Sequence, residues 1–133
     1  MRVRELMQGP LKTISTDATV AEAVQGLIAG GVSALPVLDR FGRAVGVLSH
    51  REVLAAESRC QTPAERERLF ERTLVLEVMA PWPAVAHPDT PITEAAAMML
   101  AHKVQRLFVE DQGALVGVLS QTDIVSAVAA ARI

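Results

Sequence analysis

The chain has few of the residues that supply disulfide, zinc and stacking chemistry. Cys60 is the only cysteine among 133 residues, which excludes an intrachain disulfide framework and a cysteine-based zinc cluster. Tyrosine is absent and aromatic residues make up 3%, so stacking platforms for single-stranded nucleic acid are not expected. The 13 basic and 15 acidic residues give a net charge of −2, which provides no chain-wide attraction to nucleic acid or to an anionic membrane.

Long apolar runs and catalytic motifs are also missing from the sequence. No run approaches the ~20 residues of a membrane span, and residues 1–5 lack the apolar region of a signal peptide. Glycine-rich phosphate loops, a zincin helix and a nucleophile elbow are absent, and His50, His87 and His102 show no metal-ligand spacing. Half of the residues are apolar, which is enough for a core. We therefore expect a soluble, cytoplasmic, non-enzymatic globular protein without a metal or a cofactor.

The main feature that is present is an internal repeat. The segment from Gly46 to Ser49 recurs unchanged from Gly117 to Ser120. A shift of 72 residues aligns the preceding parts of the two copies, and the shift becomes 71 after the turn near Phe41. The aligned identical pairs are Met7/Met79, Asp17/Asp89, Glu22/Glu94, Ala23/Ala95, Val32/Val104, Leu35/Leu107, Val37/Val109 and Asp39/Asp111. We infer two copies of a unit of about 50 residues.

Each copy predicts the element order β-α-β-β-α. The extended stretches and strands are expected at residues 12–15, 34–38 and 44–48 in the first copy, and at 84–87, 107–110 and 115–119 in the second. The helices are expected to turn inward the apolar residues Val20, Ala23, Val24, Leu27, Ile28, Val53 and Leu54, and then Ile92, Ala95, Ala96, Met99, Leu100, Ile124, Val125 and Val128. Thr19 with Glu22 resembles a capping box, Pro91 suits a first helical position, and Gly30-Gly31 ends a helix.

A charged segment separates the two copies. Pro63 begins a helical stretch of alternating charge that suits a solvated linker helix, while Leu69, Phe70, Leu74 and Leu76 offer the alternative of docking on a partner subunit. The expected organisation is a first repeat at 1–60, a linker at 61–76 and a second repeat at 77–133. One such unit is too small to bury enough surface alone. We therefore expect an α+β fold in which the copies pack sheet to sheet about a pseudo-twofold axis, with a cleft at each side.

These motifs resemble a tandem pair of CBS domains, the Bateman module. The resemblance rests on Leu6-Met7 and Val78-Met79, on Asp-x-x-Val/Ile-x-Glu-Ala before the first helix, on Leu-Pro-Val-x-Asp at residues 35–39, and on the repeated Gly-Val-Leu-Ser. It implies a regulatory module that binds an adenosyl nucleotide such as AMP, ADP or ATP in a cleft. It further implies a homodimer that signals to an effector protein.

The candidate ligand motif runs from Gly117 to Asp123 at a strand-to-helix junction. A helix N-terminus offers unpaired N–H groups and a positive dipole end to phosphate, and Ser120 and Thr122 add hydroxyls. An ionised Asp123 can accept hydrogen bonds from both ribose hydroxyls. By resemblance, Arg106 supplies a phosphate-binding cation. The resemblance also implies that an adenine pocket is lined by Ala84, Val85, Leu107 and Phe108.

The same motif has a structural interpretation. Ser-x-x-Asp/Glu at a helix start is also a capping box that needs no ligand. In the first copy Glu52 stands where the second has Asp123, and Ala34 stands where the second has Arg106, so Ser49, Arg51, Glu52 and Thr13 form a weaker second site. Two functions besides nucleotide sensing remain open at this point. One is a ligand-free dimerisation or protein-interaction module, and the other is nucleic-acid binding, against which the net charge counts.

Overall fold

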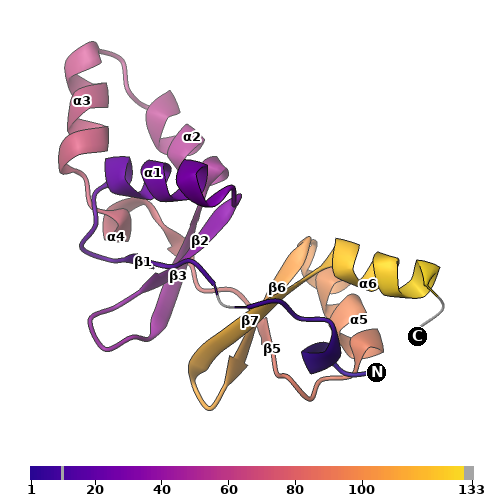
Figure 1. The fold of residues 1–133 in the computed structure, drawn as a ribbon. Coiled ribbons are helices and arrows are strands. Elements are labelled where there is room, and N and C mark those ends of the chain that lie inside the picture. Colours follow the sequence, from indigo (N-terminus) through magenta and orange to yellow (C-terminus); the bar gives the residue numbers. More distant parts are fainter. Residues whose placement is uncertain (10, 131–133) are drawn as a thin grey trace. The chain divides into compact units, whose positions relative to one another are not determined.

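The computed structural model describes residues 1–9 and 11–130 and confirms the α+β class and the element order of both repeats (Figure 1). Within these residues the second repeat follows the first element by element. The first repeat contains β1 (Ile14–Ser15), α1 (Val20–Gly30), β2 (Ala34–Leu38), β3 (Ala44–Ser49) and α2 (His50–Ser58). The second contains β5 (Val85–Ala86), α5 (Ile92–His102), β6 (Arg106–Asp111), β7 (Ala114–Ser120) and α6 (Gln121–Ala129).

The chain divides into two compact units that do not follow the repeats. One unit comprises residues 12–83, and the other combines the N-terminal segment with the chain from residue 84 onward. The ranges 1–60 and 77–133 therefore describe the duplication in the sequence. The compact units differ from them because the leading segment of each repeat belongs to the unit that contains most of the other repeat. The packing of the two sheets against each other stays a prediction.

The unit of residues 12–83 has a four-stranded sheet in the order β1-β2-β3-β4, where β4 is Ala80–Pro81. Strand β1 is parallel to β2, and the other pairs are antiparallel. Helices α1 and α2 pack on the sheet through Ala23 and Val53, which contact the cluster around Val37 and Leu48. The short helix α4 (Val75–Val78) completes this core with the fully buried Val75.

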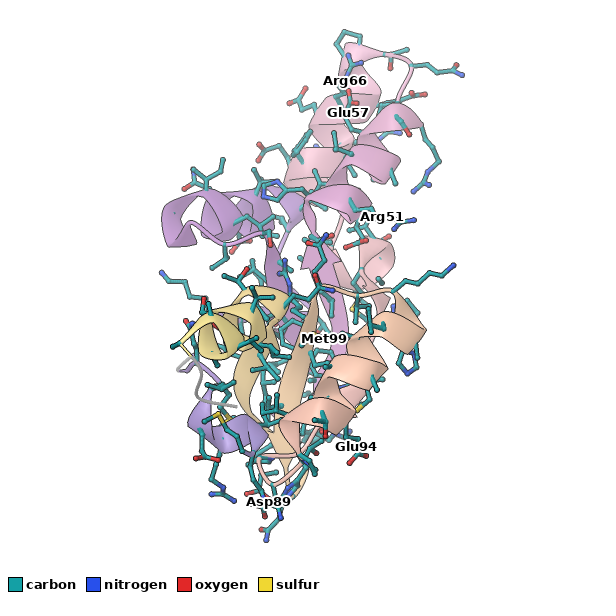
Figure 2. All side chains as sticks on the ribbon, turned by 90° about the vertical axis from the view of Figure 1, so that its right-hand side faces the viewer. Arg51, Glu57, Arg66, Asp89, Glu94 and Met99 are labelled. Carbon is teal, nitrogen blue, oxygen red and sulfur yellow. The ribbon has the colours of Figure 1, made fainter. Side chains whose placement is uncertain are left out.

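The other unit has a three-stranded sheet in the order β5-β6-β7. The N-terminal 3-10 helix η1 (Val3–Glu5) places the fully buried Val3 in its core with Met99 and Leu119. Met99 was expected in a core, and the position is confirmed; Figure 2 shows it on α5. Gln8 forms an antiparallel bridge with Val118 of β7, just as β4 pairs with β3 in the first unit.

Arg4 and Asp89 fasten the N-terminal segment to the loop before α5. Both Nε and Nη2 of Arg4 donate to Oδ1 of Asp89, and Arg2 donates to the Asp89 carbonyl at 2.5 Å. Asp89 is labelled in Figure 2. The hydrogen bond from Arg4 holds the pKa of the Asp89 carboxyl below its usual value. The ion pair thus joins residues that are 85 positions apart in the sequence.

Several helix residues that were expected to face inward are exposed, so that part of the prediction was wrong. These residues are Ile28, Leu54, Leu100, Val125 and Val128, with exposed fractions between 56% and 75%. The reason is geometric. Each helix rests on one sheet, which covers only a narrow stripe such as Val20, Ala23 and Leu27 on α1. Apolar residues one position beyond that stripe reach solvent.

Helix α3 (Pro63–Arg72) is part of the compact unit of residues 12–83, and its charged side chains are mostly exposed, as expected of a solvated helix. Its Leu69 is buried in a cluster with Val20 and Ala56, so it does not dock on a partner subunit. Its polar face remains exposed, and Arg66 donates to Oε1 of Glu57 at 2.6 Å (Figure 2). That contact raises the pKa of Arg66 and ties α3 to α2.

The expected helix termini are confirmed with one shift. Thr19 Oγ1 accepts from the Glu22 N–H at 3.2 Å while the Glu22 carboxylate accepts from the Thr19 N–H, so the capping box is complete. Helix α1 ends at Gly30, and Gly31 adopts φ 61° as its left-handed cap. Pro91 is the N-cap of α5 rather than its first helical residue.

Candidate functional site

Ser120 and Asp123 form a reciprocal capping box where β7 leads into α6. The Ser120 N–H donates to Oδ2 of Asp123 at 2.8 Å, and the Asp123 N–H donates to Oγ of Ser120 at 3.1 Å. This geometry satisfies two backbone groups at the helix start and fixes the Asp123 carboxylate beside it. Thr122 lies in the same first turn and is exposed. A carboxylate and two hydroxyl-bearing residues therefore gather at the positive end of α6.

A third residue, Gln8, joins this box and was missed by the sequence analysis. Its side-chain amide Nε2 donates to Oδ1 of Asp123 at 2.8 Å, across 115 positions of sequence. Gln8 is held in place by its backbone, which exchanges two 2.9 Å hydrogen bonds with Val118. The only signal in the sequence was the repeat alignment, which pairs Gln8 of the first repeat with Ala80 of the second and so marks a polar residue where the other copy is apolar.

The register of the sheet brings Arg106 next to Ser120. The two residues are direct partners in the antiparallel pair of β6 and β7, so their side chains project from the same face. The first repeat places Ala34 opposite Ser49 in the same register. The register thus places Arg106 opposite Ser120 in the second repeat, and Ala34 opposite Ser49 in the first.

The residues expected to line an adenine pocket do not all share one face of the sheet. Val85 and Phe108 are register partners in the parallel pair of β5 and β6, and Ala84 is exposed just before β5. The side chain of Leu107 lies in the hydrophobic core with Val3. Phe108, the next residue on the strand, is turned to the opposite face and is only 5% exposed.

The corresponding box of the first repeat is arranged differently. Oε1 of Glu52 accepts from both the N–H and the hydroxyl of Ser49, each at 2.7 Å, so a single carboxylate oxygen carries both bonds. Ser49 Oγ accepts from the Arg51 N–H at 3.2 Å. The Arg51 side chain is exposed on α2 (Figure 2), and Thr13 is exposed just before β1. The two helix starts are therefore not equivalent.

A comparison with protein families accounts for the duplicated architecture. The model of the CBS domain matches residues 3–59 and 75–130. The chain belongs to the CBS-domain family. Because the two matched ranges include both copies of the repeat, it is a tandem CBS-domain protein. The recognition of the Bateman-module pattern in the sequence is confirmed.

Relatives of this CBS pair include short CBS proteins and a larger enzyme. A CBS domain-containing protein of Dictyostelium discoideum is 32% identical over 126 residues, which cover 92% of this chain and 87% of that protein. Inosine-5'-monophosphate dehydrogenase of Methanocaldococcus jannaschii is 33% identical over 113 residues, or 84% of this chain. That alignment spans only 20% of the enzyme, so the chain corresponds to about a fifth of its length.

A solved structure of similar size supports the same fold. CBSX2 is a CBS domain-containing protein of Arabidopsis thaliana. The crystal structure of CBSX2 in complex with AMP aligns with the structure of this chain with a TM-score of 0.81 at 28% sequence identity. The alignment covers 99% of each chain.

In the CBS pair described here, no helix within residues 1–9 and 11–130 combines the length and apolar content of a bilayer crossing.

Proposed function

We propose that this CBS pair is a regulatory module that binds an adenosyl nucleotide of the AMP, ADP or ATP class at the start of α6. The observation that carries the proposal is the Asp123 carboxylate, which the capping box fixes at the helix N-terminus beside Arg106 on the neighbouring strand. Ser120 and Thr122 supply hydroxyls at the same point. The similarity to the AMP complex of CBSX2 supports this ligand class.

Each part of the nucleotide has a matching group in the proposal. The ribose hydroxyls donate to the ionised Asp123, which has lone pairs beyond those used by the capping box. The phosphate meets the positive end of the α6 dipole and the Arg106 guanidinium. The adenine lies near the backbone of Ala84 and Val85 and beside Phe108, whereas Leu107 can contribute only its backbone because its side chain is buried in the core.

The first repeat is a weaker second site in this proposal. Glu52 is longer than aspartate by one methylene, and it already uses Oε1 for two hydrogen bonds to Ser49. Arg51 is the cation closest in sequence to that box, since Ala34 stands where the second repeat has Arg106. Thr13 would add a hydroxyl from the segment before β1. We therefore expect tighter binding at the second repeat.

We also propose that the chain forms a homodimer and signals to an effector protein. Exposed apolar side chains support this assembly, because water contact with them is unfavourable and burial in an interface would relieve it. They belong to α1, α2, α5 and α6 and are Ile28, Leu54, Leu100, Val125 and Val128. Ligand binding would shift the balance between two arrangements of the assembly, provided that one arrangement binds the nucleotide more tightly. No catalytic step is part of this proposal.

Calorimetric titration with AMP, ADP and ATP tests the nucleotide site. The tighter of the two binding events is expected for wild type and for Glu52→Ala, and it should be lost in Asp123→Ala. Glu52→Ala is the matched control because both substitutions remove a capping carboxylate and cost similar helix stability, about 1 kcal/mol. At 100 times its dissociation constant a ligand should also raise the free energy of unfolding by ~2.7 kcal/mol. Equal binding by wild type and Asp123→Ala would contradict the site.

A ligand-free interaction module is the second candidate function. The observation that favours it is the capping box itself, which is complete without a ligand because each partner already satisfies the other. This function predicts that Asp123→Ala lowers stability and changes no nucleotide binding. Absence of heat with all three nucleotides, together with an unaltered dimer in sedimentation, would favour it.

A further inference from the structure

Gln8 holds the carboxylate oxygen of Asp123 that the capping box leaves available. Oδ2 of Asp123 accepts the Ser120 N–H, and Oδ1 accepts the Gln8 amide, both at 2.8 Å. Gln8 is exposed and Asp123 is half-buried. A ribose hydroxyl that bound Oδ1 of Asp123 would therefore meet the Gln8 amide at the same oxygen.

The position of Gln8 is built into the fold rather than left to a flexible tail. Its N–H and carbonyl are both paired with Val118 at 2.9 Å. The approach to strand β7 is close, since a Cβ on Gly117 would lie 3.0 Å from the Gln8 carbonyl oxygen. With the backbone fixed, only rotation of the Gln8 side chain can move the amide away from Asp123.

We propose that Gln8 is an internal competitor for the ribose hydroxyls at Asp123 and thereby sets the affinity and the sugar selectivity of the site. This inference rests on the proposed nucleotide site. A hydrogen bond to an ionised carboxylate is stronger than one between neutral groups, so its replacement by a ribose hydroxyl reduces the net gain on binding. Gln8 therefore lowers the affinity for a ribonucleotide and leaves a nucleotide without ribose hydroxyls unaffected.

The compact unit of residues 12–83 provides an internal contrast. Ala80 pairs with Val47 in the way that Gln8 pairs with Val118, but its methyl group has no donor for Glu52. The internal competitor therefore occurs in the compact unit whose helix α6 begins with the aspartate, and not at the corresponding place in the unit of residues 12–83. Because alanine already occupies this position in the unit of residues 12–83, Gln8→Ala is expected to keep the strand pairing and the fold.

The test compares wild type, Gln8→Ala and the near-isosteric Gln8→Met in titrations with AMP and with 2′,3′-dideoxy-AMP. Both variants should bind AMP about 3- to 10-fold more tightly than wild type, with the affinity for the dideoxy nucleotide unchanged. Ala80→Gln serves as the control for a glutamine at the equivalent position and should leave AMP binding at the second repeat unchanged.

Three outcomes would overturn the inference, and they are distinguishable. Unchanged or weaker AMP binding in Gln8→Ala, with binding still lost in Asp123→Ala, would show that Gln8 does not compete, and the proposed site would stand. Equal tightening for both nucleotides would show a steric effect instead. No AMP binding by wild type or by any Gln8 variant would overturn both the inference and the proposed function. Binding by Gln8→Ala alone would support the inference.

The side-chain amide of Gln8 gives a second readout that affinity alone does not provide. In an ¹⁵N-labelled sample its NH₂ resonances should move on addition of AMP toward the positions they have in Asp123→Ala, where the acceptor is missing. Dideoxy-AMP should leave them in place. Resonances that do not move at saturating AMP would mean that Asp123 accepts the amide and the ribose together, and would overturn the competition.

Discussion

Val3 and Val75 are 72 residues apart, occupy equivalent positions in the two repeats, and are each fully buried in the compact unit formed mainly by the other repeat. Val3 lies in the core of the unit that contains α5 and α6, and Val75 lies with Val37 and Leu48 in the unit of residues 12–83. Each repeat thus supplies the leading segment that completes its neighbour's core. This exchange links the stability of each repeat to a sequence outside it.

Val3→Ala and Val75→Ala should therefore destabilise different parts of the chain. Each substitution removes two buried methyl groups and leaves a cavity, so each should lower the free energy of unfolding by about 2 kcal/mol. Hydrogen exchange should show faster opening of residues 84–130 in Val3→Ala and of residues 12–83 in Val75→Ala. The reverse pattern, with each repeat weakened by its own valine, would contradict the exchange of segments.

The helix ends at Gly31 and Lys103 provide a reciprocal test. Both residues adopt a left-handed cap, with φ 61° and 55°, and they are equivalent in the repeat. A side chain in this conformation costs about 1 kcal/mol or more, which glycine avoids. Lys103→Gly should raise the free energy of unfolding by about 0.5–1 kcal/mol, and Gly31→Lys should lower it by about 1 kcal/mol. Urea denaturation measures both, and changes of the same sign would refute the explanation.

The glycines of the repeated Gly-Val-Leu-Ser segments permit a close approach of backbone. A Cβ on Gly46 would lie 2.5 Å from the Met79 sulfur and 2.7 Å from the Ala80 carbonyl oxygen, whereas on Gly117 the nearest atom would lie at 3.0 Å. Gly46→Ala should cost about 2–3 kcal/mol in unfolding free energy, and Gly117→Ala about 1 kcal/mol. Thermal and urea unfolding of both variants measure the two costs. Equal costs for Gly46→Ala and Gly117→Ala would contradict this prediction.

The ion pair of Arg4 and Asp89 should contribute a pH-dependent part of the stability. Hydrogen bonding to Arg4 lowers the pKa of Asp89 in the folded state, so its contribution is present above the unfolded pKa and is lost as pH falls through the lowered value. In Asp89→Asn or Arg4→Met, the free energy of unfolding should fall less steeply with decreasing pH below about pH 4 than it does in wild type. Denaturant midpoints between pH 7 and pH 3 measure this slope. Parallel curves for all three proteins would be inconsistent with the assignment.

Much of the local structure of this protein follows from its sequence. The 72-residue shift between Met7 and Met79 and the repeated Gly-Val-Leu-Ser predict the duplication, and the apolar spacing around Val20 predicts the first helix. The capping boxes at Thr19 and Ser120 were predictable because they join residues three positions apart. Interactions at such short separations depend on side-chain chemistry and helical geometry alone.

Long-range placement was decided by the tertiary structure. Burial of Val3 beside the second repeat, exposure of Ile28 and the docking of Leu69 depend on which surfaces meet, and no periodic pattern encodes that choice. The contact of Gln8 with Asp123 crosses 115 positions and exists because the N-terminal segment pairs with β7. The sequence thus determines the elements and their caps, whereas the competition among apolar surfaces for burial determines which segments complete each core and which side chain reaches Asp123.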